Sequence, residues 1–181
     1  MFPVGMQQND RTACADRLQK SGMKGGVHTM CGRYYIESED STLELLAIID
    51  EVNCKSKAGP VKMGEIFPTD VAPVIANNRC QKQAAFAMRW GYSMGDDRRP
   101  IINARSETAA SKPMFKDGMA HRRCLVPASY YFEWASQDGK KVKYAIRQSG
   151  SEMIYLAGLY RIEHGRLCSI FSVSGRTVTH K

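Results

Sequence analysis

The apolar positions of residues 41–52, STLELLAIIDEV, recur at the spacing of one helix face. These positions are Leu45, Ile48, Ile49 and Val52. Ser41 followed by Glu44 has the spacing of a capping box, in which a hydroxyl and a carboxylate satisfy backbone N–H groups at a helix start. The pattern therefore predicts a helix that begins at this box.

Most of the remaining apolar segments are short and are typical of strands. They are CGRYYI, VAPVIA, AAFAMRWG, IINAR, CLVPASYYFEW, KYAIR, MIYLAGLYRI and LCSIFSV. The pair Asp138-Gly139 predicts a hairpin turn. A second short helix is expected to begin at Ser106 or Glu107 and to run through TAASKPMF. We therefore expect a β-rich α+β domain with two or three helices.

The first 29 residues show neither a helical nor a strand period and are rich in Gly, Gln, Lys and Asp. Such composition is typical of a disordered leader. This segment also lacks the apolar region of a secretory signal, and no apolar run in the chain approaches the roughly 18 to 20 residues of a membrane span. These observations favour a cytoplasmic location.

The length of 181 residues fits one domain, and the net charge of +8 favours a polyanionic partner. No two of the six cysteines have the C-x-x-C spacing of a zinc or redox site. Apart from Cys31, we expect them to be reduced and mostly buried. The chain also has no Gly-rich phosphate loop, zinc helix, EF-hand loop or G-x-S-x-G elbow.

Three clusters combine reactive or ionisable groups with arginine or aromatic residues: CGRYY (31–35), INARSET (102–108) and YYFEW (130–134). Charge and stacking surfaces together are typical of proteins that bind single-stranded nucleic acid.

Each cluster also has a structural alternative. Glu133 can point outward from an edge strand, and Asn103 and Arg105 can cap a turn or pair with a neighbouring carboxylate. Trp90 and Trp134 can be core residues. Residue types alone leave these alternatives open.

Seven segments in order give the chain a family resemblance. They are MCGRYYIE, EIFPTDVAPVIA, MRWGY, IINARSETA, KPMF, RRCLVPASYYFEW and IYLAGLY. From about Met30 to Val173 the chain resembles the SOS response-associated peptidase (SRAP) family. The resemblance implies mostly antiparallel strands that form a barrel-like sheet.

The resemblance also implies a covalent reaction with DNA. In this family the initiator methionine is removed, and the following cysteine becomes the N-terminal residue. Its α-amine, with an ordinary pKa of about 7.7 to 8.0, attacks the aldehyde of an abasic site, and its thiol closes a thiazolidine ring. The implied function is a sensor and shield of abasic sites in the DNA damage or SOS response, with a lyase-like reaction and possible autoproteolysis as a peptidase.

The implied site residues match positions of this chain. Those implied to be catalytic are Cys31, Asn103, which binds near the amine and the sugar, and Glu133, which assists ring opening and proton transfer. Those implied to contact DNA are Arg33 and Arg105, which bind phosphates, and Trp90, Met114 and Trp134, which form an apolar surface and wedge. The resemblance implies a monomer that acts at the nucleoid on single-stranded DNA with abasic sites, without a cofactor or metal.

The chain departs from the family pattern at both ends. Cys31 follows a leader of 29 residues and Met30, so its nitrogen is an amide unless translation starts at Met30 or the leader, residues 1–29, is cut off. The family continues past the strand that corresponds to SIFSV with a segment I-H-x-R-M-P, whereas this sequence ends in FSVSGRTVTHK, and His180 does not match that histidine. We therefore expect residues 30–181 to be an SRAP domain that lacks its C-terminal part.

Two other functions remain as alternatives. One is a non-covalent module that binds single-stranded DNA without catalysis, which denaturation of the complex would distinguish from covalent capture. The other is a protease that acts on other proteins, for which the sequence offers no Ser/His/Asp set. Cys31 would need a partner histidine, and His28, His121 and His164 lie in segments without a carboxylate pattern.

Overall fold

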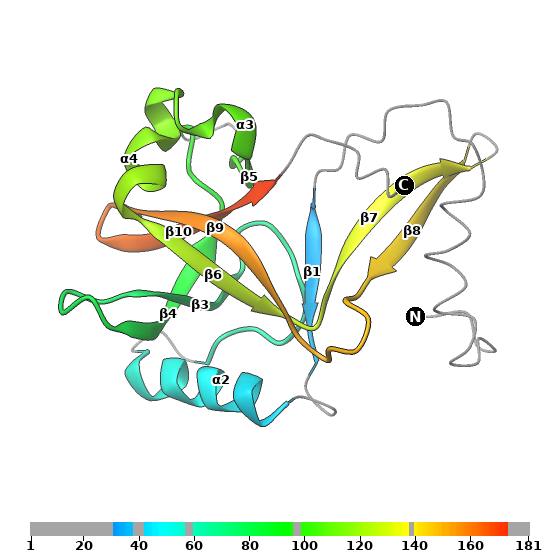
Figure 1. The fold of residues 1–181 in the computed structure, drawn as a ribbon, viewed down its shortest axis with the longest axis horizontal. Helices are drawn as coiled ribbons and strands as arrows, with labels where there is room; N and C mark the ends of the chain where they lie inside the picture. Colours follow the sequence, from blue (N-terminus) through cyan, green and yellow to red (C-terminus); the bar gives the residue numbers. More distant parts are fainter. Residues whose placement is uncertain (1–30, 38–41, 57–59, 96–98, 138–139, 174–181) are drawn as a thin grey trace. The chain divides into compact units, whose positions relative to one another are not determined.

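The computed structural model describes residues 31–37, 42–56, 60–95, 99–137 and 140–173. In these ranges ten strands are joined by three helices: α2 (Leu43–Lys55), α3 (Ser106–Ala109) and α4 (Pro113–His121) (Figure 1). This arrangement confirms the predicted β-rich α+β class. None of the described helices has the length and apolar character needed to cross a membrane.

Five strands of the larger sheet form a closed barrel. The strands of this sheet, in spatial order, are β4 (Gln83–Trp90), β3 (Val71–Asn77), β6 (Arg123–Ala128), β9 (Ile154–Glu163), β10 (Arg166–Val173) and β5 (Asn103–Arg105). β10 also pairs in parallel with β4, with Cys168 beside Arg89, and this pairing closes the ring. Closure leaves β5 as an extra strand on β10. The barrel predicted from the family resemblance is therefore present.

A smaller antiparallel sheet carries the N-terminal strand. Its order is β2 (Gly64–Ile66), β1 (Arg33–Ile36), β7 (Tyr130–Gln137) and β8 (Lys140–Ile146). The pairing of Gln137 with Lys140 confirms the predicted hairpin, although residues 138 and 139 themselves lie outside the described ranges.

The segment CLVPASYYFEW, predicted as one strand, is divided at Ser129. The Ser129 N–H donates to the Tyr35 carbonyl (2.8 Å), and its hydroxyl accepts from the Glu37 N–H (2.9 Å). These bonds turn the chain from β6 of the barrel into β7 of the smaller sheet. Apolar residues on both sides of Ser129 concealed the division, because both halves face buried surfaces.

Three aromatic rings join the two sheets in the core. Tyr34 of β1 packs edge-on against Trp90 of β4 and Phe171 of β10, with ring centroids 5.3 Å apart in both pairs. All three side chains are at most 2% exposed. Pairs of this kind add about 0.5 to 1.5 kcal/mol to the apolar burial. The contacts hold the start of β1 against the barrel.

The α2 helix forms where the apolar periodicity predicts it, and it buries Leu45, Ile49 and Val52. Its cap differs from the prediction. The Thr42 hydroxyl accepts from the Leu45 N–H (3.1 Å), so the cap is Thr42 and not Ser41, which lies outside the described residues. The Glu44 carboxylate accepts a hydrogen bond from the Tyr155 hydroxyl of β9.

The predicted second helix is two helices, α3 and α4. The residue before a proline is disfavoured in the helical region, and Lys112 is extended, with φ −81° and ψ 127°. Pro113 then occupies the start of α4, where its missing N–H costs nothing. Figure 1 shows α3 beside β5, with α4 following it. The residues at the break, Lys112 and Pro113, line a pocket.

Candidate functional site

Cys31 lies just before β1 and is 5% exposed. Its thiol donates a weak hydrogen bond to the Arg33 carbonyl (3.4 Å). The side-chain amide nitrogen of Asn103, on β5, donates to the Cys31 carbonyl (2.9 Å). The two residues meet because β5 pairs with β10, whose Phe171 packs on Tyr34 of β1. Two residues that the family resemblance places in one site are therefore in direct contact.

Glu133, on β7, is the acidic neighbour of Cys31. Burial raises the pKa of Glu133 to about 7. Burial, followed by the negative charge of Glu133, raises the pKa of the Cys31 thiol to about 12. At neutral pH the thiol is therefore protonated, while the carboxyl group is divided between its acid and base forms. A carboxyl group with this pKa can both accept and donate a proton near neutral pH.

A pocket of about 630 Å³ opens beside Asn103, between β5 and the start of α4. Its lining is mostly apolar and includes two cations: Ile101, Asn103, Arg105, Lys112, Pro113, Met114 and Phe115. Arg105 is exposed, and Met114 is half-buried. Three residues predicted from the family resemblance, Asn103, Arg105 and Met114, thus line one pocket.

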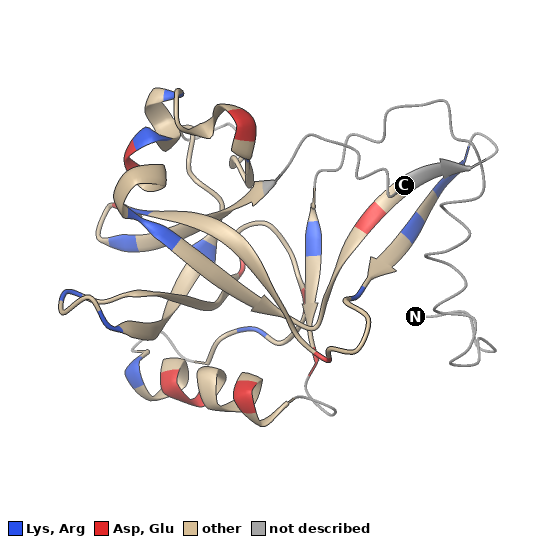
Figure 2. Cartoon of the chain, in the orientation of Figure 1, with Lys and Arg blue, Asp and Glu red and all other residues tan. Residues whose placement is uncertain are grey.

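Cations and aromatic rings alternate on the smaller sheet. The Arg33 guanidinium lies 4.5 Å from the ring centre of Phe67 and 5.5 Å from that of Trp134, and it pairs with Glu65 (3.1 Å). Lys143 binds the same carboxylate (2.6 Å). We call Arg33, Glu65, Phe67, Trp134 and Lys143 the aromatic face. Charged positions are visible on β1, β7 and β8 in Figure 2.

Trp90 lies apart from these surfaces. Its side chain is 1% exposed, its ring packs on Tyr34 and Phe171, and its indole N–H donates to the Ile102 carbonyl (3.2 Å). A ring enclosed in this way cannot stack on a DNA base. The structure therefore favours the core alternative for Trp90 over a DNA contact.

Sequence reasoning missed Tyr131 and Lys143. Burial raises the pKa of Tyr131, and the charges of Glu133 and Cys31 add to that rise. Lys143 lies opposite Trp134 in the β7–β8 register. The two-residue turn predicted at 138–139 already implies that pairing, so the turn position was the signal that could have identified Lys143.

The chain is thus a small β-barrel protein with a candidate site around a buried cysteine. The family model described as "SOS response associated peptidase (SRAP)" matches residues 30–177. This chain belongs to the SRAP family.

Curated relatives agree with this assignment. The abasic site processing protein YobE of Bacillus subtilis is 33% identical over 147 residues, which cover 72% of this chain and 61% of YobE. The abasic site processing protein YedK of Escherichia coli is 30% identical over 132 residues, which cover 72% of this chain and 59% of YedK. The chain thus spans about three fifths of the length of these relatives.

Solved structures share the fold. A phage-related protein from Bordetella bronchiseptica superposes with a TM-score of 0.59 at 24% identity, over 80% of this chain and 69% of that one. A protein from Bacteroides thetaiotaomicron gives a TM-score of 0.53 at 20% identity, over 80% of this chain and 67% of that one.

Proposed function

We propose that this protein recognises abasic sites in single-stranded DNA and attaches to them covalently through Cys31. The attachment shields the lesion from strand cleavage as part of a response to DNA damage in the cytoplasm, at the nucleoid. The reaction requires Cys31 to become the N-terminal residue, so that an α-amine and a thiol lie on adjacent carbons. Start of translation at Met30 followed by removal of that methionine, or cleavage of the chain after Met30, would produce this terminus.

The observation that carries the proposal is the position of the Asn103 amide. Its nitrogen donates to the Cys31 carbonyl, while its oxygen is buried and accepts no hydrogen bond from the described residues. An unpaired buried acceptor costs about 1 to 3 kcal/mol. An α-amine on Cys31 would bring N–H donors next to this amide and relieve that cost. We infer that Asn103 orients the nucleophile.

Glu133 supplies the proton transfers of the proposed reaction. The amine adds to the aldehyde carbon, and the carbinolamine loses water to give an iminium ion after Glu133 protonates the leaving hydroxyl. The thiol then adds to the iminium carbon, a carbon–sulfur bond forms, and the thiol proton passes to the Glu133 carboxylate. The products are one thiazolidine and one water. A pKa of about 7 suits a group that acts in both directions.

The two surfaces beside Cys31 would hold the strand. Arg105 and Lys112 at the pocket suit phosphates, and the apolar lining with Met114 suits a flipped sugar or a displaced base. Phe67 and Trp134 of the aromatic face suit stacking. In this proposal the protein acts as a monomer, and imine chemistry requires neither a metal nor an organic cofactor.

The test is a denaturing gel of single-stranded DNA with one abasic site. A chain that begins at Met30, checked by mass spectrometry for removal of that methionine, should give a band that survives boiling. Cys31→Ala should give no boiling-resistant band, and Cys31→Ser should give one only after reduction of its imine. The full chain tested in parallel should crosslink only if mass spectrometry detects Cys31 as its N-terminus.

A folded protein with a free Cys31 terminus that leaves no such band would overturn covalent capture. The second candidate, non-covalent binding of single-stranded DNA, would then remain, because the aromatic face suits that function without any bond to Cys31. A filter-binding measurement on undamaged DNA would test it.

A further inference from the structure

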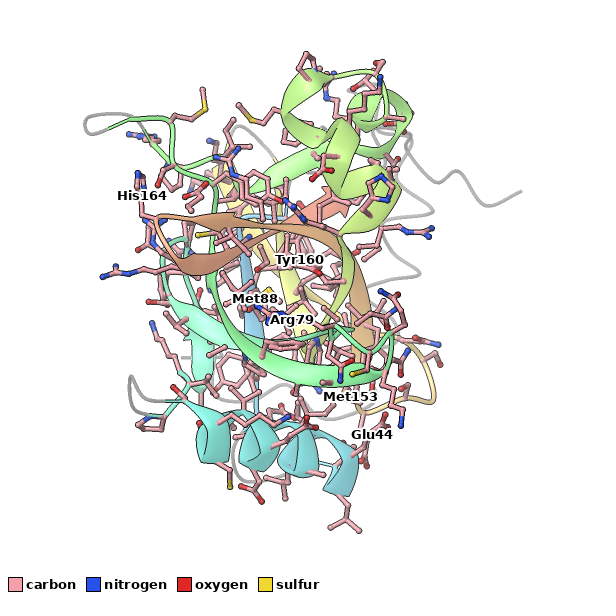
Figure 3. All side chains as sticks on the ribbon, turned by 90° about the vertical axis from the view of Figure 1, so that its left-hand side faces the viewer. Glu44, Arg79, Met88, Met153, Tyr160 and His164 are labelled. Carbon is pink, nitrogen blue, oxygen red and sulfur yellow. The ribbon has the colours of Figure 1, made fainter. Side chains whose placement is uncertain are left out.

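A second pocket, of about 480 Å³, lies at the opposite end of α4 from the pocket beside Asn103. Its lining is polar and comes from the β3–β4 turn, the end of α4, β6 and β9: Asn77, Asn78, Arg79, Gln81, Ala120, His121, Arg123 and Tyr160. Arg79 and Tyr160 are labelled together on the face of the barrel in Figure 3. The proposed reaction at Cys31 does not use this pocket.

The charge of this pocket is positive and uncompensated. No carboxylate lines it, and within the described part of the chain neither Arg79 nor Arg123 forms an ion pair. Several cations elsewhere do form ion pairs: Arg33 and Lys143 share Glu65, Lys62 pairs with Asp70, and Arg147 pairs with Glu37. The C-terminus of α4 contributes a partial negative charge of about half an elementary charge, which two full positive charges outweigh.

The frame of the pocket is fixed by hydrogen bonds. The Asn78 side-chain oxygen accepts from the N–H groups of Cys80 (2.9 Å) and Lys82 (3.1 Å), which sets the turn that carries Arg79. On the other side, the Tyr160 N–H donates to the Arg122 carbonyl (2.9 Å), which joins β9 to the end of α4. A rigid frame reduces the conformational entropy that binding must remove.

We propose that this pocket binds a backbone phosphate of the DNA strand that flanks the abasic site. Paired guanidinium groups with amide and hydroxyl donors suit a phosphate diester. The nine residues of α4 span roughly 13 Å at 1.5 Å per residue, so a single strand of several nucleotides can reach both pockets. The inference rests on the proposed function, because it assigns the strand that the site at Cys31 would hold.

The experiment compares two double variants of the full chain that each remove two positive charges. Arg79→Gln with Arg123→Gln alters the pocket, whereas Lys55→Gln with Arg166→Gln removes exposed cations that line neither pocket. The measurement is the anisotropy of a labelled 30-nucleotide single strand without a lesion, at several salt concentrations. Circular dichroism and Tm check that each variant is folded.

We expect the pocket variant to bind about tenfold more weakly and to lower the slope of log K against log salt by about 0.7, which is the contribution of one phosphate contact on a single strand. The control variant should change the slope by less than about half that amount. Equal slopes for the two variants would overturn the proposal.

Two further measurements distinguish a failure of this inference from a failure of the proposed function. Capture of abasic DNA by the chain that begins at Met30 reports the proposed function independently, since it needs only Cys31 and its neighbours. Inorganic phosphate, added in a thermal shift measurement, tests a small ligand. If phosphate raises the Tm of the control variant alone while the DNA slopes remain equal, the pocket takes a small phosphate compound, and its assignment to DNA is wrong.

Discussion

Cys31 and Cys124 are two thiols in nearly equal burial but in different surroundings. They are 5% and 6% exposed, and burial raises the pKa of each to about 12. Burial alone raises the pKa of Cys124, whereas Glu133 contributes to that of Cys31. A buried thiol by itself is a small core residue. The polar groups around Cys31 distinguish a site from a core position.

The backbone around the two thiols differs as well. Cys124 lies in β6, which is paired on both sides by β3 and β9 of the barrel. Cys31 precedes β1, and its carbonyl binds a side chain, Asn103, instead of a neighbouring strand. Of these two cysteines, only Cys31 is therefore positioned so that it can become the N-terminal residue without loss of a strand.

The largest expected effect concerns Glu133, the carboxyl group that lies near Cys31 and has no counterpart near Cys124 among the described residues. Glu133→Gln should slow capture of abasic DNA by about 10²- to 10⁴-fold at pH 7, because it removes the proton donor and acceptor. It should also remove an inflection near pH 7 from the rate profile. Quantified gels across pH 5.5 to about 8.5 would measure both effects. Glu152→Gln, at an exposed position, is the matched control and should behave as the unmodified chain; a retained inflection in Glu133→Gln would contradict the role.

The next effect tests whether the surroundings of Cys124 are purely structural. A Cβ at Gly158 would lie 2.7 Å from the Ile170 carbonyl oxygen and 3.0 Å from the Cys124 sulfur. Because the carbonyl cannot move without disturbing the β9–β10 pairing, Gly158→Ala should lower the free energy of unfolding by about 2 to 3 kcal/mol. Urea denaturation would measure the loss. Gly150→Ala, with open space but a φ of 74°, separates crowding from backbone strain.

A smaller effect is the dependence of stability on pH. The folded pKa of Glu133 exceeds its ordinary value of 4.5, so the folded state binds more protons between pH 4.5 and about 7. Stability should therefore fall as pH rises through this range and then level off. Because the carboxyl group is only half-buried, we expect a fall of about 1 to 2 kcal/mol. The difference between the parent chain and Glu133→Gln, from denaturant unfolding at each pH, isolates this contribution, and a difference that does not vary with pH would contradict it.

The smallest effect should come from Cys124→Ala. Removal of one buried sulfur leaves a small cavity and should cost about 1 kcal/mol of stability. The fraction of abasic DNA captured by folded protein should not change. Cys31→Ala, measured in the same gel, should instead abolish capture. A loss of capture in Cys124→Ala, after correction for unfolded protein, would remove the distinction between the two thiols.

Sequence reasoning succeeded where the signal is local. The spacing of Leu45, Ile49 and Val52 predicted α2, and the Asp138-Gly139 pair predicted the β7–β8 hairpin. It was less accurate where two neighbouring residues compete. Ser41 and Thr42 can both cap a helix, and only the path of the chain selects Thr42.

The arrangement of the site depended on distant contacts. Asn103 follows Cys31 by 72 residues, and no periodicity predicts their hydrogen bond. The family resemblance assigned both residues to one site, and the structure places them in direct contact. Trp90 shows where sequence reasoning fails. A tryptophan looks the same in the sequence whether it lies in a core or on a binding surface, and only its burial in the structure separates the two cases.

The pairing of β4 with β10 has a consequence for the lifetime of an adduct. This pairing joins strands that are far apart in the sequence, such as Arg89 beside Cys168, and it closes the ring, so no strand of the barrel can separate without breaking pairings on both of its sides. Proteases cut a folded domain only when it opens, so a slowly opening barrel resists digestion. A protein bound to DNA through Cys31 would therefore persist for a time set by the unfolding rate of the barrel, however quickly the bond itself had formed.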